Sequence, residues 1–301
     1  MPESARTWRV RDHDLTLDEP LVAGVLNVTP DSFSDGGRFL APRDAVARAH
    51  EMVEDGADLL DVGAESTRPG ADPVPPDEQW SRLAPVLEGL RGLGIPISID
   101  TRSLAVAERA LGAGASAIND VSGLRDEPEL ARLAARTGAG LVVMHMRGTP
   151  RTMQGDVRYA DLVGEVRAAL ERARQTALEA GCDPRQVAVD PGIGFGKSVE
   201  GNLELLGRLD EIRPPGAPVW VGPSRKSFLG RLLDAPPDRR VAGTIGACLA
   251  AVRAGADVVR VHDVRAVKDA LRVERAVARE ASAAPLRRAR EGAAVAAGGR
   301  G

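Results

Sequence analysis

Eight short apolar runs, each with a polar residue at or near its end, constrain the fold of this chain more than any other feature. In chain order the runs read LVAGVLN, DLLDVG, IPISID, SAIND, GLVVMH, QVAVD, VWVGPS and VVRVH. Their polar residues are Asn27, Asp61, Asp100, Asn119, His145, Asp190, Ser224 and His262. Such runs are typical of parallel strands buried on both faces. Chemistry in a parallel barrel gathers at the carboxyl ends of the strands, so these residues are the first candidates for an active site.

Helical patterns separate most of these runs. The spacing of Ala45, Ala49 and Met52 predicts a first helix. Further helices are predicted over residues 77–92, 103–113, 127–137, 158–181, 201–211, 238–254 and 264–282, between strands over 58–62, 95–100, 116–120, 140–145, 187–190, 218–223 and 257–262. This alternation favours a closed TIM (β/α)8 barrel over an open doubly wound sheet. Such barrels typically have about 250 residues, so the 301 residues of this chain fit a single domain.

The two ends of the chain lie outside this alternation. Residues 7–17 alternate weakly between polar and apolar, which predicts a short N-terminal hairpin before the first barrel strand. The last stretch, APLRRAREGAAVAAGGRG, is rich in Ala and Gly and lacks periodicity. We therefore predict a barrel domain over residues 1–283 and a disordered C-terminal tail over residues 284–301.

Composition limits the kind of core, the partners and the cellular location that we expect for this chain. Aromatic residues make up 3% of the chain, so the core must be aliphatic, and the formal net charge of −3 argues against a nucleic-acid partner. Cys182 and Cys248 form no CxxC motif. A disulfide between them stays open, although two isolated cysteines favour a reducing cytoplasm. The sequence has no secretory h-region and no membrane-spanning apolar run, so we expect a cytoplasmic location and no membrane partner.

Two polar loops follow the first two strands. The stretch NVTPDSFSDGG, which begins at Asn27, offers an amide oxygen and the carboxylates of Asp31 and Asp35 to a hard cation. A turn-rich loop bonded to itself would have the same composition. The motif ESTRPG places Arg68 on a rigid loop, where its planar guanidinium suits an anionic ligand. The plainer alternative for Arg68 is a surface salt bridge.

Three strand-end residues, Asp100, Asn119 and Asp190, indicate recognition of a heterocycle. A buried carboxylate must be paired or neutralised. A 2-amino-4-oxo pyrimidine ring presents adjacent N–H donors to a carboxylate, and an Asn side chain can donate and accept at another edge of the ring. The plainer alternative is that each residue caps the helix that follows it.

The later loops carry glycines and cations. The loop PGIGFGKS resembles a phosphate-binding P-loop, but Pro191 stands where the first glycine is required. We expect instead a flexible loop that places Phe195 over a flat ligand, with a plain glycine-rich turn as the alternative. The segment SRKS (residues 224–227) follows the seventh strand, and Arg260 and His262 share one face of the eighth. Barrel loops after these two strands often bind anions, so a second cationic region is predicted there.

Eight motifs in a fixed order resemble one enzyme family, the bacterial dihydropteroate synthases. They are NVTPDSFSDGG, ESTRPG, SIDT, INDVSG, MHMRGTPRTMQ, DPGIGFGK, GPSRKS and RVHDV, and the resemblance runs from about residue 21 to residue 280. It implies a barrel enzyme, usually a homodimer, that acts in folate synthesis. Such enzymes condense 6-hydroxymethyl-7,8-dihydropterin pyrophosphate with para-aminobenzoate and release pyrophosphate, with Mg²⁺ as cofactor.

The same resemblance assigns roles to residues of this chain. The pterin pocket that it implies consists of Asp100, Asn119, Asp190 and Lys226, and the substrate site also includes Met144 and Gly222. The pyrophosphate site that it implies consists of Asn27, Arg68, Arg260 and His262, with Asn27 also on Mg²⁺. The implied aminobenzoate site consists of Thr67, Phe195, Ser227 and the loop at Pro69. The residues implied in catalysis are Asp35 and Arg68 on two mobile loops, together with Asp100 and Lys226.

Three other functions compete with this interpretation. A pterin-binding methyltransferase that uses methyltetrahydrofolate and a corrinoid partner would share the carboxylates but has no reason to carry the Arg68 loop or the SRKS cluster. A catalytically silent relative that only binds a pterin or phosphate would be expected to lose the loops after strands 1, 2 and 5, which are intact here. A P-loop nucleotidase is disfavoured by Pro191.

Overall fold

Eight parallel strands form the centre of the molecule. The computed structural model describes residues 6–29, 42–68 and 70–298. The strands are β3 (Leu21–Asn27), β4 (Leu59–Gly63), β5 (Ile97–Asp100), β6 (Ala117–Asp120), β7 (Gly140–Met144), β8 (Val187–Asp190), β9 (Trp220–Val221) and β10 (Val258–Val261). Their order is β8-β7-β6-β5-β4-β3-β10-β9, and a parallel bridge between Val189 and Val219 joins the two end strands. The sheet is therefore a closed barrel, which confirms the TIM-barrel prediction and rules out the open sheet.

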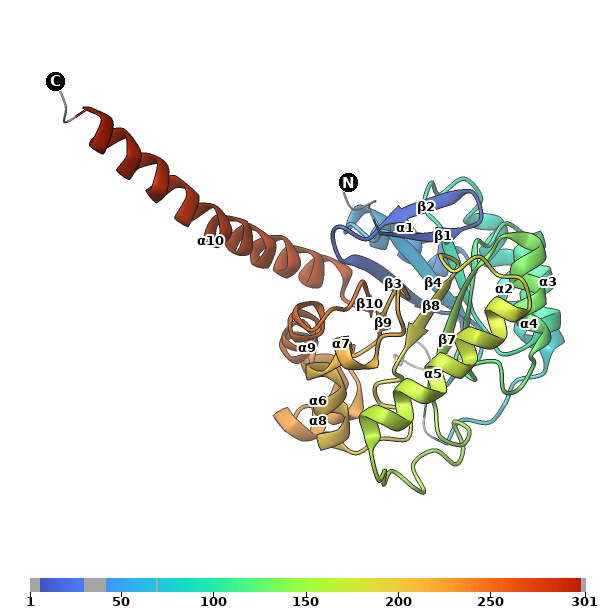
Figure 1. The fold of residues 1–301 in the computed structure, drawn as a ribbon. Helices are drawn as coiled ribbons and strands as arrows, with labels where there is room; N and C mark the ends of the chain where they lie inside the picture. The colour runs from blue at the N-terminus through green and yellow to red at the C-terminus, as the bar shows by residue number, and fades with distance from the viewer. Residues whose placement is uncertain (1–5, 30–41, 69, 299–301) are drawn as a thin grey trace.

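Helices surround this barrel on the outside (Figure 1). They are α1 (Pro42–Glu54), α2 (Pro76–Gly89), α3 (Leu104–Gly112), α4 (Glu129–Thr137), α5 (Leu162–Glu179), α6 (Val199–Gly207), α7 (Leu209–Ile212), α8 (Ser227–Leu233), α9 (Val241–Arg253) and α10 (Val264–Gly298). The single helix predicted over 201–211 is divided into α6 and α7. The sequence analysis missed α8, because seven residues are too few to establish a helical period.

An N-terminal hairpin closes the end of the barrel at which the strands begin. It consists of β1 (Thr7–Val10) and β2 (His13–Thr16), as the sequence predicted. Trp8 and Val10 are fully buried in a cluster with inward-facing strand residues, among them Val142 and Trp220. Gly140 at the start of β7 leaves the space for this plug, since a Cβ there would lie 2.5 Å from Val10 Cγ1. The lower half of the barrel is therefore filled by hydrophobic packing.

The last helix, α10, begins against the barrel and then runs away from it toward the C-terminus (Figure 1). Its backbone stays helical to Gly298, through residues for which the sequence predicted a disordered tail. The part beyond the barrel has no neighbouring element in Figure 1 to stabilise it by tertiary packing. The division of the chain at residue 283 stays a prediction. Among the described residues, no helix is long and apolar enough to cross a membrane.

Candidate active site

Four of the strand-end side chains meet inside the barrel, at the carboxyl ends of the strands. Arg260 of β10 donates from Nε to Asp61 Oδ2, and from Nη2 to Asp100 Oδ2 at 2.8 Å. Asn119 of β6 donates from Nδ2 to the same Asp61 oxygen at 3.1 Å. Asp61, Asp100 and Asn119 are all buried. These contacts join side chains from four strands into a polar floor for the barrel mouth.

A second pair of charges lies beside this floor. Asp190 of β8 and Lys226 after β9 interact electrostatically, and Lys226 Nζ donates to the carbonyl of Ile193. The same ammonium lies 4.4 Å from the centre of the Phe195 ring. Gly222 borders this pair, because a Cβ at its position would lie 3.7 Å from Lys226 Nζ and 3.7 Å from Arg260 Cβ. A larger residue at 222 would therefore extend toward the two cations.

Burial sets the protonation of this cluster. It raises the pKa of Asp100 to about 7, against the attraction of Arg260, and the charge of Asp61 raises it further. Burial also raises the pKa of Asp190, which Lys226 and the Gly192 amide oppose. The pKa of Lys226 falls to about 8, chiefly through burial and in spite of Asp190. The mouth therefore holds acids and a base whose pKa values have moved toward neutral pH, which is common in active sites.

The glycine-rich loop after β8 is held by a buried lysine. Lys197 is 4% exposed, and its Nζ donates to the carbonyls of Gly192 and Phe195, both at 2.9 Å. It also lies 3.1 Å from His145 Nδ1 and donates to the His145 carbonyl at 3.3 Å. Its amine is thus occupied by protein acceptors, which agrees with the rejection of a P-loop. The expectation of a flexible loop differs from this arrangement, in which one ammonium ties the loop to the end of β7.

His262 and the SRKS segment are built differently from the polar floor. The Oγ of Ser224 lies 3.0 Å from His262 Nδ1, and burial together with Arg260 and Arg225 lowers the pKa of His262 to about 3. His262 is therefore a neutral imidazole near neutral pH. Arg225 forms a bidentate ion pair with Asp263, with Nε 2.9 Å from Oδ2. Of the SRKS cations, Lys226 faces the mouth, whereas Arg225 joins the β9 and β10 loops.

The loops after β3 and β4 form the remaining rim. Asn27 ends β3 and is half-buried, and among the described residues no group of three or more His, Cys, Asp or Glu side chains is arranged to hold a metal ion. Thr67 is half-buried and Arg68 exposed, and the charge of Arg68 contributes to the lowered pKa of His262. Asp31, Phe33, Asp35 and Pro69 lie outside the described residues, so the predicted roles of Asp35 and the Pro69 loop stay predictions.

The plainer alternatives for the strand-end residues fail in the structure. Asp100 and Asn119 bond to side chains across the barrel and cap no helix. Asp190 accepts from the amide of Gly192 at 2.7 Å, a local turn contact that leaves its other oxygen for a partner. The helices that follow these three strand ends have other N-cap residues, Ser103 for α3, Pro128 for α4 and Ser198 for α6.

Of the other substrate-site residues expected from the sequence, Met144 and Phe195 lie in one small apolar cluster with Val121, Met146 and Met153. Ser227 is exposed at the first turn of α8. The sequence analysis assigned no role to Asp61 or Lys197. Asp61 was one of the eight polar residues of the apolar runs, so its position in the second run was a signal. Nothing else in the sequence distinguished a residue of the site from a buried aspartate that forms a structural ion pair.

Comparisons with known proteins agree with this geometry. A family model described as "Pterin binding enzyme" matches residues 23–262. The fold and the site together define a pterin-binding enzyme, and this chain belongs to that family. Within the family it belongs to the dihydropteroate synthases, which are transferases of folate biosynthesis.

The similarity covers most of the chain. The curated dihydropteroate synthase of Synechocystis sp. is 48% identical over 254 residues, which are 84% of this chain and 88% of that protein. The solved structure of Burkholderia cenocepacia dihydropteroate synthase with 7,8-dihydropteroate has a TM-score of 0.84 and 45% identity, covering 92% of this chain and 98% of that one. The Xanthomonas albilineans enzyme with 4-aminobenzoic acid has a TM-score of 0.84 and 44% identity, covering 90% and 98%.

Proposed function

We propose that this chain condenses 6-hydroxymethyl-7,8-dihydropterin pyrophosphate with para-aminobenzoate, giving 7,8-dihydropteroate and pyrophosphate, and that the residues below perform the reaction. The observation that carries the proposal is the convergence of Asp100, Asn119, Asp190 and Lys226 in one mouth, beside the half-buried cation of Arg260. A site with both acidic and cationic groups suits a substrate that has a donor-rich ring at one end and an anionic group at the other.

Recognition of the pterin ring follows from the donors and acceptors of the mouth. The second oxygen of Asp190 and the carbonyl of Asn119 accept hydrogen bonds from the N–H groups of the ring. Lys226 donates from Nζ to the ring carbonyl. Phe195 stacks on a flat ligand from the glycine-rich loop, next to the same ammonium. Because Lys197 fixes this loop, Phe195 is positioned before the ligand binds.

The leaving group requires positive charge. Arg68 and His262 lie on the rim, and Arg260 reaches the mouth from below, so these three bind the pyrophosphate and stabilise the charge that develops on it. His262 acts as a neutral hydrogen-bond donor, since its pKa is about 3. Asn27 can supply one oxygen ligand to Mg²⁺, an ion that usually takes few protein ligands and completes its shell with water and phosphate. When bound there, Mg²⁺ would neutralise charge on the leaving pyrophosphate.

The condensation requires no strong base, because each bond that breaks or forms has its electron pair accounted for. The bond from the pterin methylene carbon to oxygen breaks, and its electron pair leaves with pyrophosphate. The positive charge on the methylene spreads into the ring, where Asp100 and Asp190 stabilise it electrostatically. The lone pair of the aminobenzoate nitrogen then forms the new C–N bond, and the nitrogen loses one proton to solvent or to the departing pyrophosphate. The loops that carry Asp35 and Arg68 exclude water, which would otherwise compete as nucleophile.

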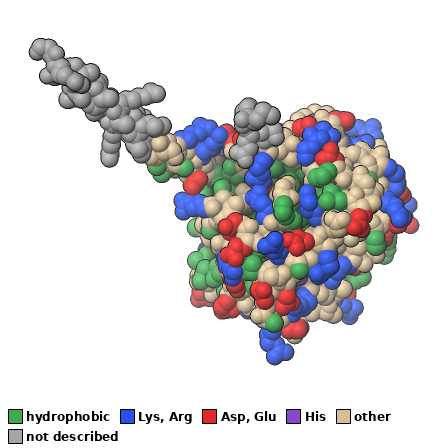
Figure 2. Space-filling model, viewed as in Figure 1, with side chains coloured by type: hydrophobic (Ala, Val, Ile, Leu, Met, Phe, Trp, Pro, Cys, Tyr) green, Lys and Arg blue, Asp and Glu red, His purple; other side chains and the backbone are tan. Residues whose placement is uncertain are grey.

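We further propose that the enzyme is a cytoplasmic homodimer. The large apolar side chains that are exposed among the described residues are Leu203, Leu232, Leu233, Val273 and Val277. They belong to α6, α8 and α10, and α6 and α8 both contact α9. Figure 2 displays hydrophobic side chains gathered over this edge of the barrel. A large exposed apolar patch on a globular protein commonly marks an interface, and this one would be covered by a second copy.

The test is a direct assay of the condensation. Purified protein with Mg²⁺ and both substrates should release pyrophosphate and form dihydropteroate in equal amounts. Omission of aminobenzoate should reduce pyrophosphate release to the slow rate of hydrolysis. Methyl transfer from methyltetrahydrofolate to a corrinoid would identify the methyltransferase, and pterin binding without turnover would identify a silent relative. Phosphate release from ATP without either substrate would identify a nucleotidase.

A further inference from the structure

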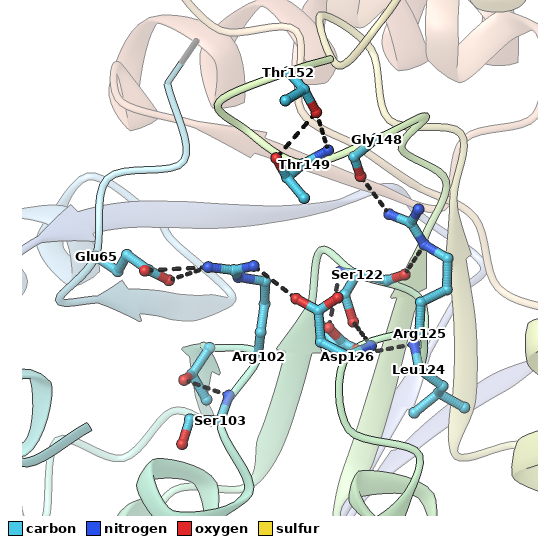
Figure 3. Close-up of polar contacts among 12 residues, drawn as sticks. Glu65, Arg102, Ser103, Ser122, Leu124, Arg125, Asp126, Gly148, Thr149 and Thr152 are labelled. Atoms are coloured by element: carbon cyan, nitrogen blue, oxygen red, sulfur yellow. Dashed lines mark hydrogen bonds and ion pairs between the residues drawn. The ribbon is translucent and has the colours of Figure 1, made fainter. Parts of the chain in front are cut away.

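Four loops at the barrel mouth are joined in a closed circuit of hydrogen bonds and ion pairs that the catalytic proposal does not use. Figure 3 shows the part of the circuit that runs from Glu65 to Gly148. Arg102, in the loop after β5, donates from Nη2 to both carboxylate oxygens of Glu65, at 3.2 and 3.3 Å. From Nη1 it donates to Asp126, in the loop after β6, at 2.6 Å. One guanidinium therefore bridges the loop that carries Arg68 to the loop after β6.

The circuit continues through the next two loops. The Oγ of Ser122 accepts from the Asp126 amide at 3.3 Å, and Arg125 donates from Nε to the Ser122 carbonyl at 2.8 Å. Arg125 also donates from Nη2 to the carbonyl of Gly148, after β7, at 3.0 Å. From there the chain reaches Pro150, whose carbonyl accepts from the Gly70 amide at 3.1 Å. Gly70 lies in the same loop as Glu65, so the circuit returns to its start.

The loop between Glu65 and Val74 is clamped at its base by this arrangement. Glu65 Oε1 accepts from the Val74 amide at 3.0 Å, which joins two points nine residues apart. The Val74 carbonyl accepts from Gln79 Nε2 at 2.8 Å. Thr67 and Arg68 lie within the span that this clamp closes. The position of the two residues therefore depends on the orientation of the Glu65 carboxylate, and that carboxylate is held by Arg102.

Burial and two neighbouring carboxylates hold the Arg102 guanidinium in this position. Its side chain is 19% exposed and that of Glu65 6%, so water contributes little to either charge. Burial alone would lower the pKa of Arg102, but Glu65 and Asp126 outweigh it and the pKa is raised. The Nε of Arg102 is buried without a partner among the described residues, an uncompensated polar group that persists because the two carboxylates hold the guanidinium in place.

We propose that Arg102 is a positioning residue for the aminobenzoate half of the reaction: through Glu65 and Asp126 it fixes the loop that presents Thr67 and Arg68 to the two substrates. It touches neither substrate itself. The proposal rests on the proposed function, and it predicts a selective defect. Recognition of the pterin ring depends on Asn119, Asp190, Lys226 and Phe195, none of which belongs to the circuit, whereas aminobenzoate binding and charge stabilisation depend on the clamped loop.

The test compares Arg102→Met with a matched control, Arg109→Met. Arg109 pairs with Asp77 at 2.8 Å and joins α3 to α2, so it links the same two units of the barrel, but on the exposed surface. In Arg102→Met we expect kcat/KM for aminobenzoate to fall about 10- to 100-fold, the scale of a misplaced binding group. The dissociation constant of 6-hydroxymethylpterin, which has no pyrophosphate, should stay within about twofold, because the floor is untouched. Arg109→Met should match the unaltered enzyme in both measurements.

Two further measurements separate positioning from general stability. Exchange of the Val74 amide proton in the free enzyme should become faster in Arg102→Met and not in Arg109→Met. Arg102→Lys, which can still pair with one carboxylate, should recover part of the activity. Should Arg102→Met fail to fold, Asp126→Ala provides the same comparison from the other end of the bridge, with a smaller expected fall of about threefold.

The outcomes are distinct. If the unaltered enzyme releases no pyrophosphate with both substrates present, the proposed function is wrong. If the enzyme is active and the folded Arg102 or Asp126 variants keep its kcat/KM for aminobenzoate, Arg102 serves stability alone and the inference is overturned. The inference is also overturned by an equal loss of pterin and aminobenzoate binding, since that result would place the defect in the whole mouth.

Discussion

The two ends of this barrel differ in chemistry, because one end is filled by apolar side chains and the other by charged ones. Where the strands begin, the interior is filled by Trp8, Val10, Trp220 and small aliphatic residues, and the hairpin β1–β2 covers it. Where the strands end, the buried carboxylates of Asp61 and Asp100 pair with the half-buried guanidinium of Arg260. The first arrangement maximises hydrophobic packing, and the second pays a desolvation cost for charges that packing alone would exclude. The difference teaches that stability and chemistry are assigned to separate ends of the same eight strands.

The largest effect should come from the apolar end. Trp8 is fully buried, packs edge-to-face on Trp220 with 5.2 Å between ring centres, and donates from Nε1 to the Gln186 carbonyl at 2.9 Å. Trp8→Ala should lower the free energy of unfolding by about 3–5 kcal/mol, the usual cost of emptying such a site. Urea titration measures the loss. Condensation at a temperature where the variant stays folded should be nearly unchanged, and a large fall in kcat would break the division between the two ends.

Asp190→Asn should produce the reverse pattern, with a loss of ligand binding and little change in stability. The amide keeps the shape and can still accept from Gly192, but it places N–H donors against the donors of the pterin ring. We expect pterin affinity to fall by about 3 kcal/mol, within the range for breaking a buried charged pair. The melting temperature should change little. Calorimetric titration with 6-hydroxymethylpterin and a thermal melt are the measurements, and normal binding with early melting would make Asp190 a structural residue.

Lys226→Met should have a smaller effect on the same ligand. The replacement keeps most of the length of the side chain but removes the ammonium, and with it the cation–π contact with the Phe195 ring. Pterin affinity should fall by about 1–3 kcal/mol, the range for a hydrogen bond to a charged group. Unchanged affinity in calorimetry would show that the contact of Lys226 with the Ile193 carbonyl is its whole function.

The smallest effect concerns pH. Asp100, with a pKa of about 7, must lose its proton to stabilise positive charge, so kcat/KM should rise as the pH rises through that value. Lys226, with a pKa of about 8, must keep its proton to donate to the ring, so kcat/KM should fall as the pH rises further. A narrow bell is expected, with changes of roughly tenfold at its sides. In Lys226→Met the alkaline side should become shallower, and a flat profile in the parent enzyme would contradict the assignment of both groups.

Much of the fold could be predicted from the sequence, because buried parallel strands leave a strong local signal. All eight barrel strands were located by apolar runs with a polar residue at or near their end, and the sequence also placed Asp100, Asn119 and Asp190 at one edge. The helix α8 was missed for a local reason, since Ser227–Leu233 is shorter than two helical periods.

The partners within the site could not be predicted in the same way. Arg260 contacts Asp61 and Asp100, which lie 199 and 160 residues away in the chain, and this pairing depends on the register of four strands. The sequence indicated that Arg260 and His262 share a face, but not that the arginine reaches across the barrel while His262 binds Ser224. Lys197 lies in a loop that did not match the P-loop motif, and most of its partners are backbone carbonyls, which no residue pattern records.

The protein has only three lysines among its 40 cationic residues, and all three are engaged inside the fold. Lys197 is buried in the glycine-rich loop, Lys226 lies in the mouth, and Lys268 pairs with Asp58 at 2.6 Å. The outer surface therefore carries its positive charge almost entirely as guanidinium, which amine reagents do not attack. With a pKa of about 8, Lys226 is partly an unprotonated amine at mildly alkaline pH. Among the lysine side chains, an acylating reagent small enough to enter the barrel would consequently label Lys226 before the buried Lys197, and protection of that label would report on occupancy by a pterin.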